Sequence, residues 1–400
     1  MLKQIYRRSF KHLSLAVIII GAGSFFVSNI LLKGIFTATT YGYYSIVVTY
    51  ISLVFVVGIL GLDQVFIRFS KNVSKNRIET QRAQIVLAVI SICVTSVLSS
   101  VWFHNYFPQI PVNNYLLFFS SLSMIGLLFL FSILRLNSNF VLAQLASNSW
   151  KVVMLALAGF YYFRWLSGFT NFVNIVFIST IVFFVICLWY VLHFIKFHFN
   201  NEISKKQIVV SAFHFFISLL SASLILFADR FIIENKFSIE QFGDFFYLTN
   251  FFLAPYSILQ NYISFKQLII FKKKFDLDYF ARYNRRVFLI GIVFGLFLLI
   301  TAIGMQQFGL VKFDFKNHLL VVILLLLTGT LRIYSSSINS AFEARVTIRI
   351  LQKSNVYIIF VTIATLLAAY FVASSISMIL ICVMFIWLFR CFIHQKFLIK

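Results

Sequence analysis

Charge is what this chain most lacks. Only 11% of its 400 residues are Asp, Glu, Lys or Arg, and just 11 residues are acidic. At the same time 61% of the residues are hydrophobic, 52 are Phe, and the mean hydropathy is +0.95. A soluble domain of this size could not cover so much apolar surface with so few charges, so lipid must surround most of the chain. The composition predicts a polytopic membrane protein.

Cysteine is equally rare, and its placement argues against two kinds of site. The four cysteines are Cys93, Cys187, Cys382 and Cys391. All fall within or at the ends of apolar runs, and no two form a C-x-x-C pair. Neither a disulfide framework nor a zinc site is therefore indicated.

Catalytic and nucleotide-binding signatures are also missing. The chain contains no G-x-x-x-x-G-K-[ST], H-E-x-x-H or G-x-S-x-G motif, and no soluble segment is large enough for a nucleotide-binding domain. We therefore expect no enzymatic activity, no resident cofactor and no metal site, and no ATP-driven work by this chain alone. The acidic pair Asp276 and Asp278 lies in a basic segment and is interpreted as a solvated face.

Long apolar runs are what the sequence does contain. A helix needs roughly 17 to 22 apolar residues to cross a hydrocarbon core of about 30 Å. Twelve runs approach or meet this length, and the predicted fold class is an all-α membrane protein of twelve spans. The predicted spans are Leu13–Leu32, Tyr44–Leu62, Ile85–Trp102, Tyr115–Leu134, Asn148–Phe163, Phe172–Leu192, Ile208–Phe227, Phe245–Ile263, Val287–Ile303, Leu319–Ile338, Val356–Val372 and Ile376–Phe392.

The distribution of basic residues predicts the orientation. Lys and Arg concentrate in cytoplasmic loops, and with the amino terminus inside, 28 of the 34 basic residues fall in inner segments and 6 in outer ones. Both termini are therefore predicted to be cytoplasmic. The net charge of +23 then reflects attraction to anionic headgroups rather than binding of nucleic acid.

Two halves of the chain look like copies of one unit. Three alignments, offset by about half the chain, carry this inference: Asp229 with Asn29 and Phe242-Gly243 with Tyr41-Gly42, Leu331-Arg332 with Leu134-Arg135, and Ser354-Asn355 with Ser147-Asn148. We predict a six-helix bundle over residues 1–200 and a second over residues 201–400. Each copy has an even number of spans, so the two share one orientation and face each other across a central cavity.

Several short segments, together with this layout, resemble a known family. They are "YGYYS" after the first span, "GLDQVFIRF" at the end of the second, and "ADRFII" followed by "FGDFFYL" after the seventh. The whole chain resembles the Wzx-type polysaccharide flippases of O-antigen and capsule pathways. That family belongs to the multidrug/oligosaccharidyl-lipid/polysaccharide exporter superfamily.

The resemblance implies an activity. A flippase of this kind moves a repeat unit of O-antigen, capsule or exopolysaccharide, linked to undecaprenyl diphosphate, across the bacterial inner membrane by alternating access. The unit passes from the cytoplasmic leaflet to the periplasmic one. The family also implies coupling to an H⁺ or Na⁺ gradient, and as partners membrane lipids, a polysaccharide polymerase and a chain-length regulator.

Two arginines are the first candidates for a site that binds an anionic headgroup. An arginine at the centre of a membrane helix costs about 2.5 to 3.5 kcal/mol, so one retained there suggests an anionic ligand or a partner. Arg332 lies about a turn and a half before the end of its predicted span, and Arg135 lies at the inner end of its span. Snorkelling to headgroups is the alternative explanation for both.

Acidic candidates flank two other spans. Asp63 follows Gly58 and Gly61, which permit close helix approach, and it is expected either to pair with Arg68, to carry a proton, or to be solvated at the membrane boundary. Asp229 and Arg230 end the seventh span; they either reach water at the outer interface or form a gate or coupling site.

Proline is rare, with three in the chain, and one of them lies inside a predicted span. Pro255 removes a backbone hydrogen bond from the eighth span, and neighbouring groups can satisfy the freed carbonyl. We predict a hinge there.

Two rival functions share parts of this pattern. A multidrug exporter of the same fold takes small cations and should carry more acids than bases deep in its spans. An O-antigen polymerase has similar hydropathy but carries a long extracytoplasmic loop and no two-half repeat. The longest predicted outer loop here runs only from about Ala228 to Asp244.

Overall fold

The computed structural model describes residues 2–74, 76–200, 203–273 and 275–399. Within them the chain is organised as two compact units, Met1–Ser223 and Leu224–Lys400. The predicted boundary after residue 200 falls immediately before helix α8 (Lys205–Lys236), whose first part belongs to unit 1 and whose second part belongs to unit 2.

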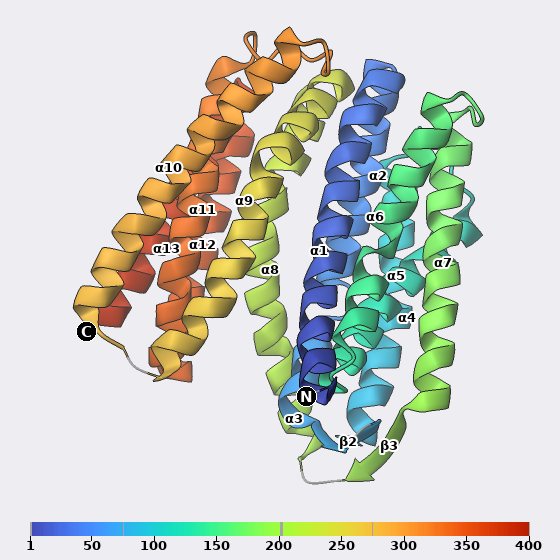
Figure 1. Cartoon of the computed structure of the whole chain (residues 1–400), viewed down its shortest axis with the longest axis vertical. Coiled ribbons are helices and arrows are strands. Elements are labelled where there is room, and N and C mark those ends of the chain that lie inside the picture. Colours follow the sequence, from blue (N-terminus) through green and yellow to red (C-terminus); the bar gives the residue numbers. More distant parts are fainter. Residues whose placement is uncertain (1, 75, 201–202, 274, 400) are drawn as a thin grey trace. The chain divides into compact units, whose positions relative to one another are not determined.

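Unit 1 contains seven further helices (Figure 1). They are α1 (Leu2–Ile35), α2 (Ala38–Val57), α3 (Leu62–Phe69), α4 (Arg82–Tyr106), α5 (Asn114–Leu136), α6 (Phe140–Tyr162) and α7 (Phe169–Phe194). The central helix is α5, which packs against α2, α3, α4, α6 and α7, while α1 packs along α6. The buried side of α5 carries serines, and Ser121 shares a 2.5 Å hydrogen bond with the hydroxyl of Tyr50 from α2.

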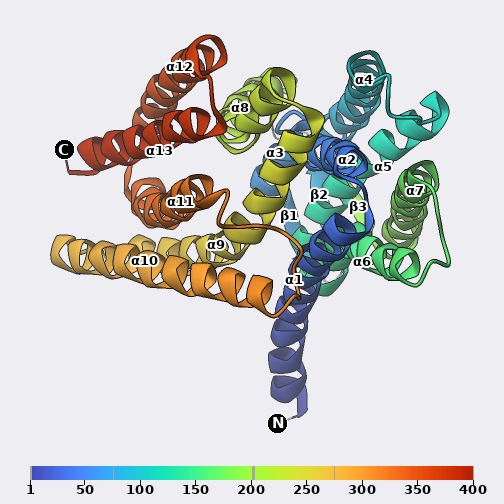
Figure 2. The ribbon, with the colours of Figure 1, turned by 90° about the horizontal axis from the view of Figure 1, so that it is seen from above.

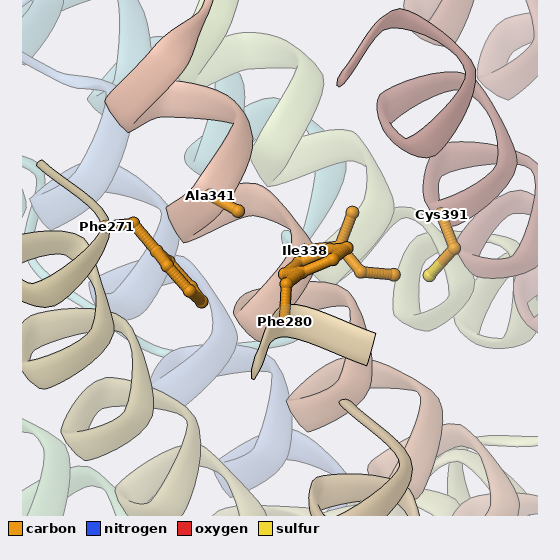
Figure 3. Packing of buried hydrophobic residues seen from close by; sticks show 5 residues of the cluster. All are labelled: Phe271, Phe280, Ile338, Ala341 and Cys391. Carbon is orange, nitrogen blue, oxygen red and sulfur yellow. The ribbon is translucent and has the colours of Figure 1, made fainter. Parts of the chain in front are cut away.

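Unit 2 contains the second part of α8 and five more helices. They are α9 (Ile239–Lys273), α10 (Leu277–Gln307), α11 (Leu319–Arg345), α12 (Ile348–Val372) and α13 (Ile376–Ile399). Here α11 is central, because α9, α10 and α13 all pack against it, as the view along the helices shows (Figure 2). An apolar cluster joins these four helices near the carboxyl end of α11 (Figure 3); it consists of Phe271, Phe280, Ile338, Ala341 and Cys391.

Most helices are long and apolar enough to span a membrane. Among the described residues, 11 helical segments meet that criterion, with α2 and α3 counted as one segment. Large apolar side chains lie exposed along α4, α7 and α10, as expected for faces in contact with lipid. The predicted eighth span lies in α9, which is not among the 11 because its sequence is more polar. With 35 residues, α9 is nevertheless about 52 Å long, enough to cross a bilayer.

The prediction of an all-α fold was incomplete, because unit 1 also contains a small sheet. Strand β1 (Lys71–Ser74) pairs antiparallel with β2 (Arg77–Gln81), and β2 pairs in parallel with β3 (Lys196–Asn200). The sheet lies at the same end of unit 1 as the start of α1 (Figure 1). The distribution of basic residues predicts cytoplasmic segments at these positions and does not predict strands. They are too short and too polar to show a clear strand pattern.

The predicted second span is interrupted at its glycines. Helix α2 ends at Val57, and α3 begins at Leu62 after Gly61, which has a φ of 76°. A Cβ at Gly58 would lie 2.5 Å from Ile125, and one at Gly61 would lie 2.7 Å from the backbone nitrogen of Phe216. The glycines therefore permit close approach, as predicted, and Gly61 also allows the left-handed turn that separates the two helices.

Candidate functional site: a buried charge cluster in unit 2

Arg332 lies deeper in its helix than the sequence suggested. The predicted span ended at Ile338, but α11 continues to Arg345, which makes Arg332 the middle residue of a 27-residue helix. Buried hydroxyl groups lie on either side of it in the sequence, at Thr330 and Ser335. Since the middle of α11 is far from both ends, simple snorkelling does not explain this arginine.

Asp229 is also inside its helix rather than at the end. Helix α8 continues to Lys236, about two turns beyond Asp229. The side chain is only 6% exposed, and its Oδ1 accepts a 2.8 Å hydrogen bond from the backbone N–H of Arg230. The positive charges of both Arg230 and Arg332 act on this carboxylate. The structure thus brings together three of the residues singled out from the sequence.

Arg230 packs among aromatic rings. Its guanidinium carbon lies 5.4 Å from the ring centre of Phe227 and 5.1 Å from that of Phe246 on α9. Both distances are typical of cation–π contacts. The buried Nε of Arg230 has no hydrogen-bond partner among the described residues.

A second pair of basic and aromatic residues adjoins Arg332 from α13. The guanidinium carbon of Arg332 lies 5.6 Å from the ring centre of Trp387, and that of Arg390 lies 5.5 Å from the same ring. Within the described part of the chain, the buried Nε atoms of both arginines lack a hydrogen-bond partner. Sequence reasoning missed Trp387 and Arg390, although an arginine inside the last apolar run was a usable signal.

Basic side chains outnumber the acids that could neutralise them in this region. The charge of Asp229 acts on Arg230 and Arg332, whereas the exposed Glu343 acts on Arg390. Arginines whose buried Nε atoms lack a partner among the described residues, next to few carboxylates, form an environment that favours an anion with several acceptor oxygens.

The repeat-related position in unit 1 is built differently. Asn29 is 2% exposed, and its Oδ1 accepts hydrogen bonds from the hydroxyls of Tyr41 at 3.3 Å and Tyr44 at 3.2 Å. In the alignment of the two halves, phenylalanines Phe242 and Phe245 occupy the places of these tyrosines, and phenylalanine has no hydroxyl to donate. Unit 1 therefore has a neutral, satisfied network where unit 2 has charges.

The other candidates in unit 1 lie apart from any comparable cluster. Asp63 is 4% exposed; its Oδ2 accepts a 2.7 Å hydrogen bond from Gln64, and the charge of Arg135 acts on it. Arg135 is exposed at the second-to-last position of α5, as expected for a snorkelling residue. The exposed guanidinium of Arg68 lies 5.9 Å from the ring centre of Phe69 and 5.9 Å from that of Phe215.

Helix positions also bear on the proposed match of Arg135 with Arg332. Arg332 is central in α11, whereas Arg135 lies at the end of α5, so the two do not occupy equivalent places in their helices. The distribution of basic residues predicts inner segments for Lys151, Arg332 and Arg390, but these residues lie well inside α6, α11 and α13. Lys151 is the middle residue of α6 and donates a 2.9 Å hydrogen bond to Asn148.

Pro255 lies inside α9, as predicted, and the helix continues through it. The next residue, Tyr256, is 1% exposed and donates a 2.9 Å hydrogen bond to the carbonyl oxygen of Gly291 on α10. The kink expected at Pro255 is therefore next to a tight contact between helices.

Comparisons with known proteins identify the fold. The structure resembles that of the lipid II flippase MurJ in an inward closed conformation, with a TM-score of 0.69 and 13% identity over 97% of this chain and 87% of that one. It also resembles a MATE mutant, with a TM-score of 0.54 and 13% identity over 97% of this chain and 94% of that one. No family model and no curated protein sequence matches the chain.

Proposed function

We propose that this multi-pass membrane protein, which has the fold of MurJ and of a MATE protein, is a flippase for oligosaccharide repeat units linked to undecaprenyl diphosphate. It moves them from the cytoplasmic to the periplasmic leaflet of a bacterial inner membrane, as a Wzx-type protein of an O-antigen, capsule or exopolysaccharide pathway.

The observation that carries the proposal is the position of Arg332. A guanidinium at the middle of a membrane helix, with a buried Nε that lacks a partner among the described residues, is costly unless an anion binds it. A diphosphate supplies both negative charge and acceptor oxygens in the geometry that arginine recognises. The similarity to a lipid II flippase supports a substrate of the same general kind, a polar headgroup on a lipid.

The proposed cycle uses alternating access. Arg332 and Arg230 hold the diphosphate in the membrane interior, while the isoprenoid tail stays in lipid. Asp229 supplies a negative charge that acts on both guanidiniums when no substrate is bound. Coupling to H⁺ or Na⁺ and cooperation with a polymerase and a chain-length regulator belong to the same proposal.

Export of small cationic molecules is the second candidate. The similarity to a MATE structure and the buried carboxylate of Asp229 favour it. A cation would bind Asp229 and be repelled by Arg230 and Arg332. The two functions therefore make opposite predictions for Arg332: its removal abolishes flipping of a diphosphate but improves the binding of a cation.

The deciding experiment follows lipid-linked sugar in cells that lack the protein. The glycan is extracted and sized, and its leaflet is determined with an impermeant glycan-modifying reagent. The proposal predicts single repeat units trapped on the inner leaflet and no surface polysaccharide. Single units displayed on the outer leaflet would indicate a polymerase, and unchanged polysaccharide would direct attention to small-molecule export.

Complementation then tests the site. We expect Arg332→Ala to fail and Arg332→Lys to restore only part of the activity, because lysine keeps the charge but not the planar pair of donors. Arg285→Ala is the matched control, since Arg285 is an exposed arginine on α10. Restoration of surface polysaccharide by Arg332→Ala at normal expression would contradict the assigned role.

A further inference from the structure

Trp387 contacts two charge groups of unit 2. Its indole is 4% exposed and contacts the guanidiniums of both Arg332 and Arg390. The charges that act on Arg332 are those of Asp229 and Arg230, whereas Glu343 is the acid that acts on Arg390. Two arginines thus share one aromatic ring while each has its own acidic neighbour.

The second group lies toward the carboxyl ends of α11 and α13. Arg390 and His394 are four residues apart on α13 and so project from the same face of the helix. Glu343 is near the end of α11, about 16 Å along the helix from Arg332. Glu343 is therefore not part of the site around Asp229 and Arg332, and the two groups meet only at Trp387, which Arg332 and Arg390 both contact.

His394 adds the clearest sign of a ligand. It is 2% exposed, and its ring stacks on Phe342 with 4.3 Å between centroids and 12° between planes. Neither Nδ1 nor Nε2 has a hydrogen-bond partner in the described part of the chain, and the buried Nε of Arg390 has none either. Stacking holds the imidazole by its face, so its nitrogens remain available at the ring edge.

We infer that Arg390 and His394 form a second anion-binding site, for the phosphate group of a lipid, next to the Trp387 ring that Arg332 also contacts. A guanidinium and an imidazole N–H are suitable donors for phosphate oxygens, and burial strengthens such charge-assisted bonds. The inference extends the proposed function, because it describes where a phosphate is held before or after it contacts Arg332.

Two sources would supply the same chemistry at this site. One is the diphosphate of the transported lipid, and the other is the phosphate of an ordinary anionic phospholipid such as phosphatidylglycerol. In the first case the two arginines form successive stations for the headgroup. In the second case a resident lipid occupies the Arg390 site and sets the charge near Trp387.

Lipid binding to the purified full-length protein tests the site. Native mass spectrometry counts the bound molecules during titration with undecaprenyl diphosphate and, separately, with phosphatidylglycerol. We expect Arg390→Gln to weaken binding of one molecule by about tenfold or more, as loss of a charge-assisted hydrogen bond predicts. His394→Gln should weaken it less, and the exposed control Arg285→Gln should leave binding unchanged.

The lipid whose binding changes in Arg390→Gln identifies the source of the bound phosphate group. An effect of Arg390→Gln on undecaprenyl diphosphate indicates a second station for the substrate, and an effect confined to phosphatidylglycerol indicates a resident lipid; both support the site. The inference is overturned if Arg390→Gln and His394→Gln bind both lipids as the wild type does.

Folding and function are controlled separately. Size-exclusion chromatography shows whether each variant is monodisperse, and His394→Gln, which keeps an amide donor of similar size, stands in if Arg390→Gln does not fold. The proposed function fails on a different measurement, the leaflet that holds the single repeat units in deletion cells. Failure of the lipid-binding experiment therefore does not contradict the proposed function, and failure of the leaflet assay does not contradict the second anion-binding site.

Discussion

The ring of Tyr256 occupies the space that a side chain at Gly329 would need. A Cβ built on Gly329 would lie 2.5 Å from the Cδ2 atom of Tyr256, closer than real contacts allow. This places the backbone of α11 directly against α9, beside Pro255 and three residues before Arg332.

Replacement of Gly329 should therefore separate these helices. We expect Gly329→Ala to lower the free energy of unfolding by about 1–3 kcal/mol, the usual cost of overpacking. The thermal midpoint of the purified protein measures the effect. Gly304→Ala is the control, since no atom lies within 4 Å of a Cβ at Gly304 and alanine favours the helix. Equal thermal midpoints for Gly329→Ala and Gly304→Ala would show that α9 can shift away from α11 without a loss of stability.

Charge coupling between Asp229 and Arg332 makes a second prediction. The charges of Asp229 and Arg332 act on each other, so Asp229→Asn and Arg332→Gln should each leave a charge uncompensated and destabilise the protein, with a coupling energy of about 0.5–3 kcal/mol. The double variant should recover part of that loss, because neither charge then remains. A double-mutant cycle on unfolding midpoints measures the coupling, with exposed Asp278→Asn as control.

If the losses of stability in Asp229→Asn and Arg332→Gln simply add up to the loss in the double variant, the charge coupling between the two residues is contradicted. The double variant should nevertheless fail to restore surface polysaccharide, since it lacks the guanidinium that is proposed to bind the diphosphate. We therefore expect the double variant to regain part of its stability but not its transport activity.

The neutral network around Asn29 makes a third prediction. We expect Asn29→Leu to destabilise unit 1 by about 1–3 kcal/mol, because the hydroxyls of Tyr41 and Tyr44 then lose their shared acceptor. Tyr44→Phe should cost about 1 kcal/mol, the net value of one hydrogen bond. Thermal unfolding checks both changes, and Tyr43→Phe, at a less buried tyrosine, is the control. If Tyr43→Phe lowers the thermal stability as much as Tyr44→Phe does, the stabilising role assigned to the Asn29 hydrogen bonds is contradicted.

Pro255 makes a fourth prediction, which concerns rate rather than stability. Pro255→Ala restores the backbone N–H inside α9 and stiffens the helix, so expression and the unfolding midpoint should stay normal or rise. If the proline is a hinge, surface polysaccharide in complemented cells should appear more slowly. Unchanged transport in a stable Pro255→Ala protein would make Pro255 a tolerated residue and not a hinge.

Sequence reasoning located the membrane helices well because their signal is strong. Runs of apolar residues are long, and lipid requires every backbone group to be satisfied within the helix, so composition alone predicts spanning helices. The same reasoning misplaced helix ends. It held each span to the length needed to cross the hydrocarbon core and so ended one span at Ile338, although α11 continues to Arg345.

The count of basic residues also hid part of the site. Lys151 and Arg390 were counted with the inner basic residues, although both lie inside the predicted spans Asn148–Phe163 and Ile376–Phe392 and inside helices of the structure. Asp229 and Arg332 were recognised singly, but they lie on different helices about a hundred residues apart in the sequence. Only the packing of unit 2 shows that the charge of one acts on the other.

The parallel pairing of β2 with β3 has a consequence for how unit 1 is made. Helices α4 to α7 lie between the two strands in the chain, so β3 emerges from the ribosome only after all four helices have been synthesised. Chains insert and fold from the amino terminus as they emerge. The pairing of Arg77 with Lys196 therefore forms only after α7 has been made, and only the first part of α8 is then still to be added to unit 1.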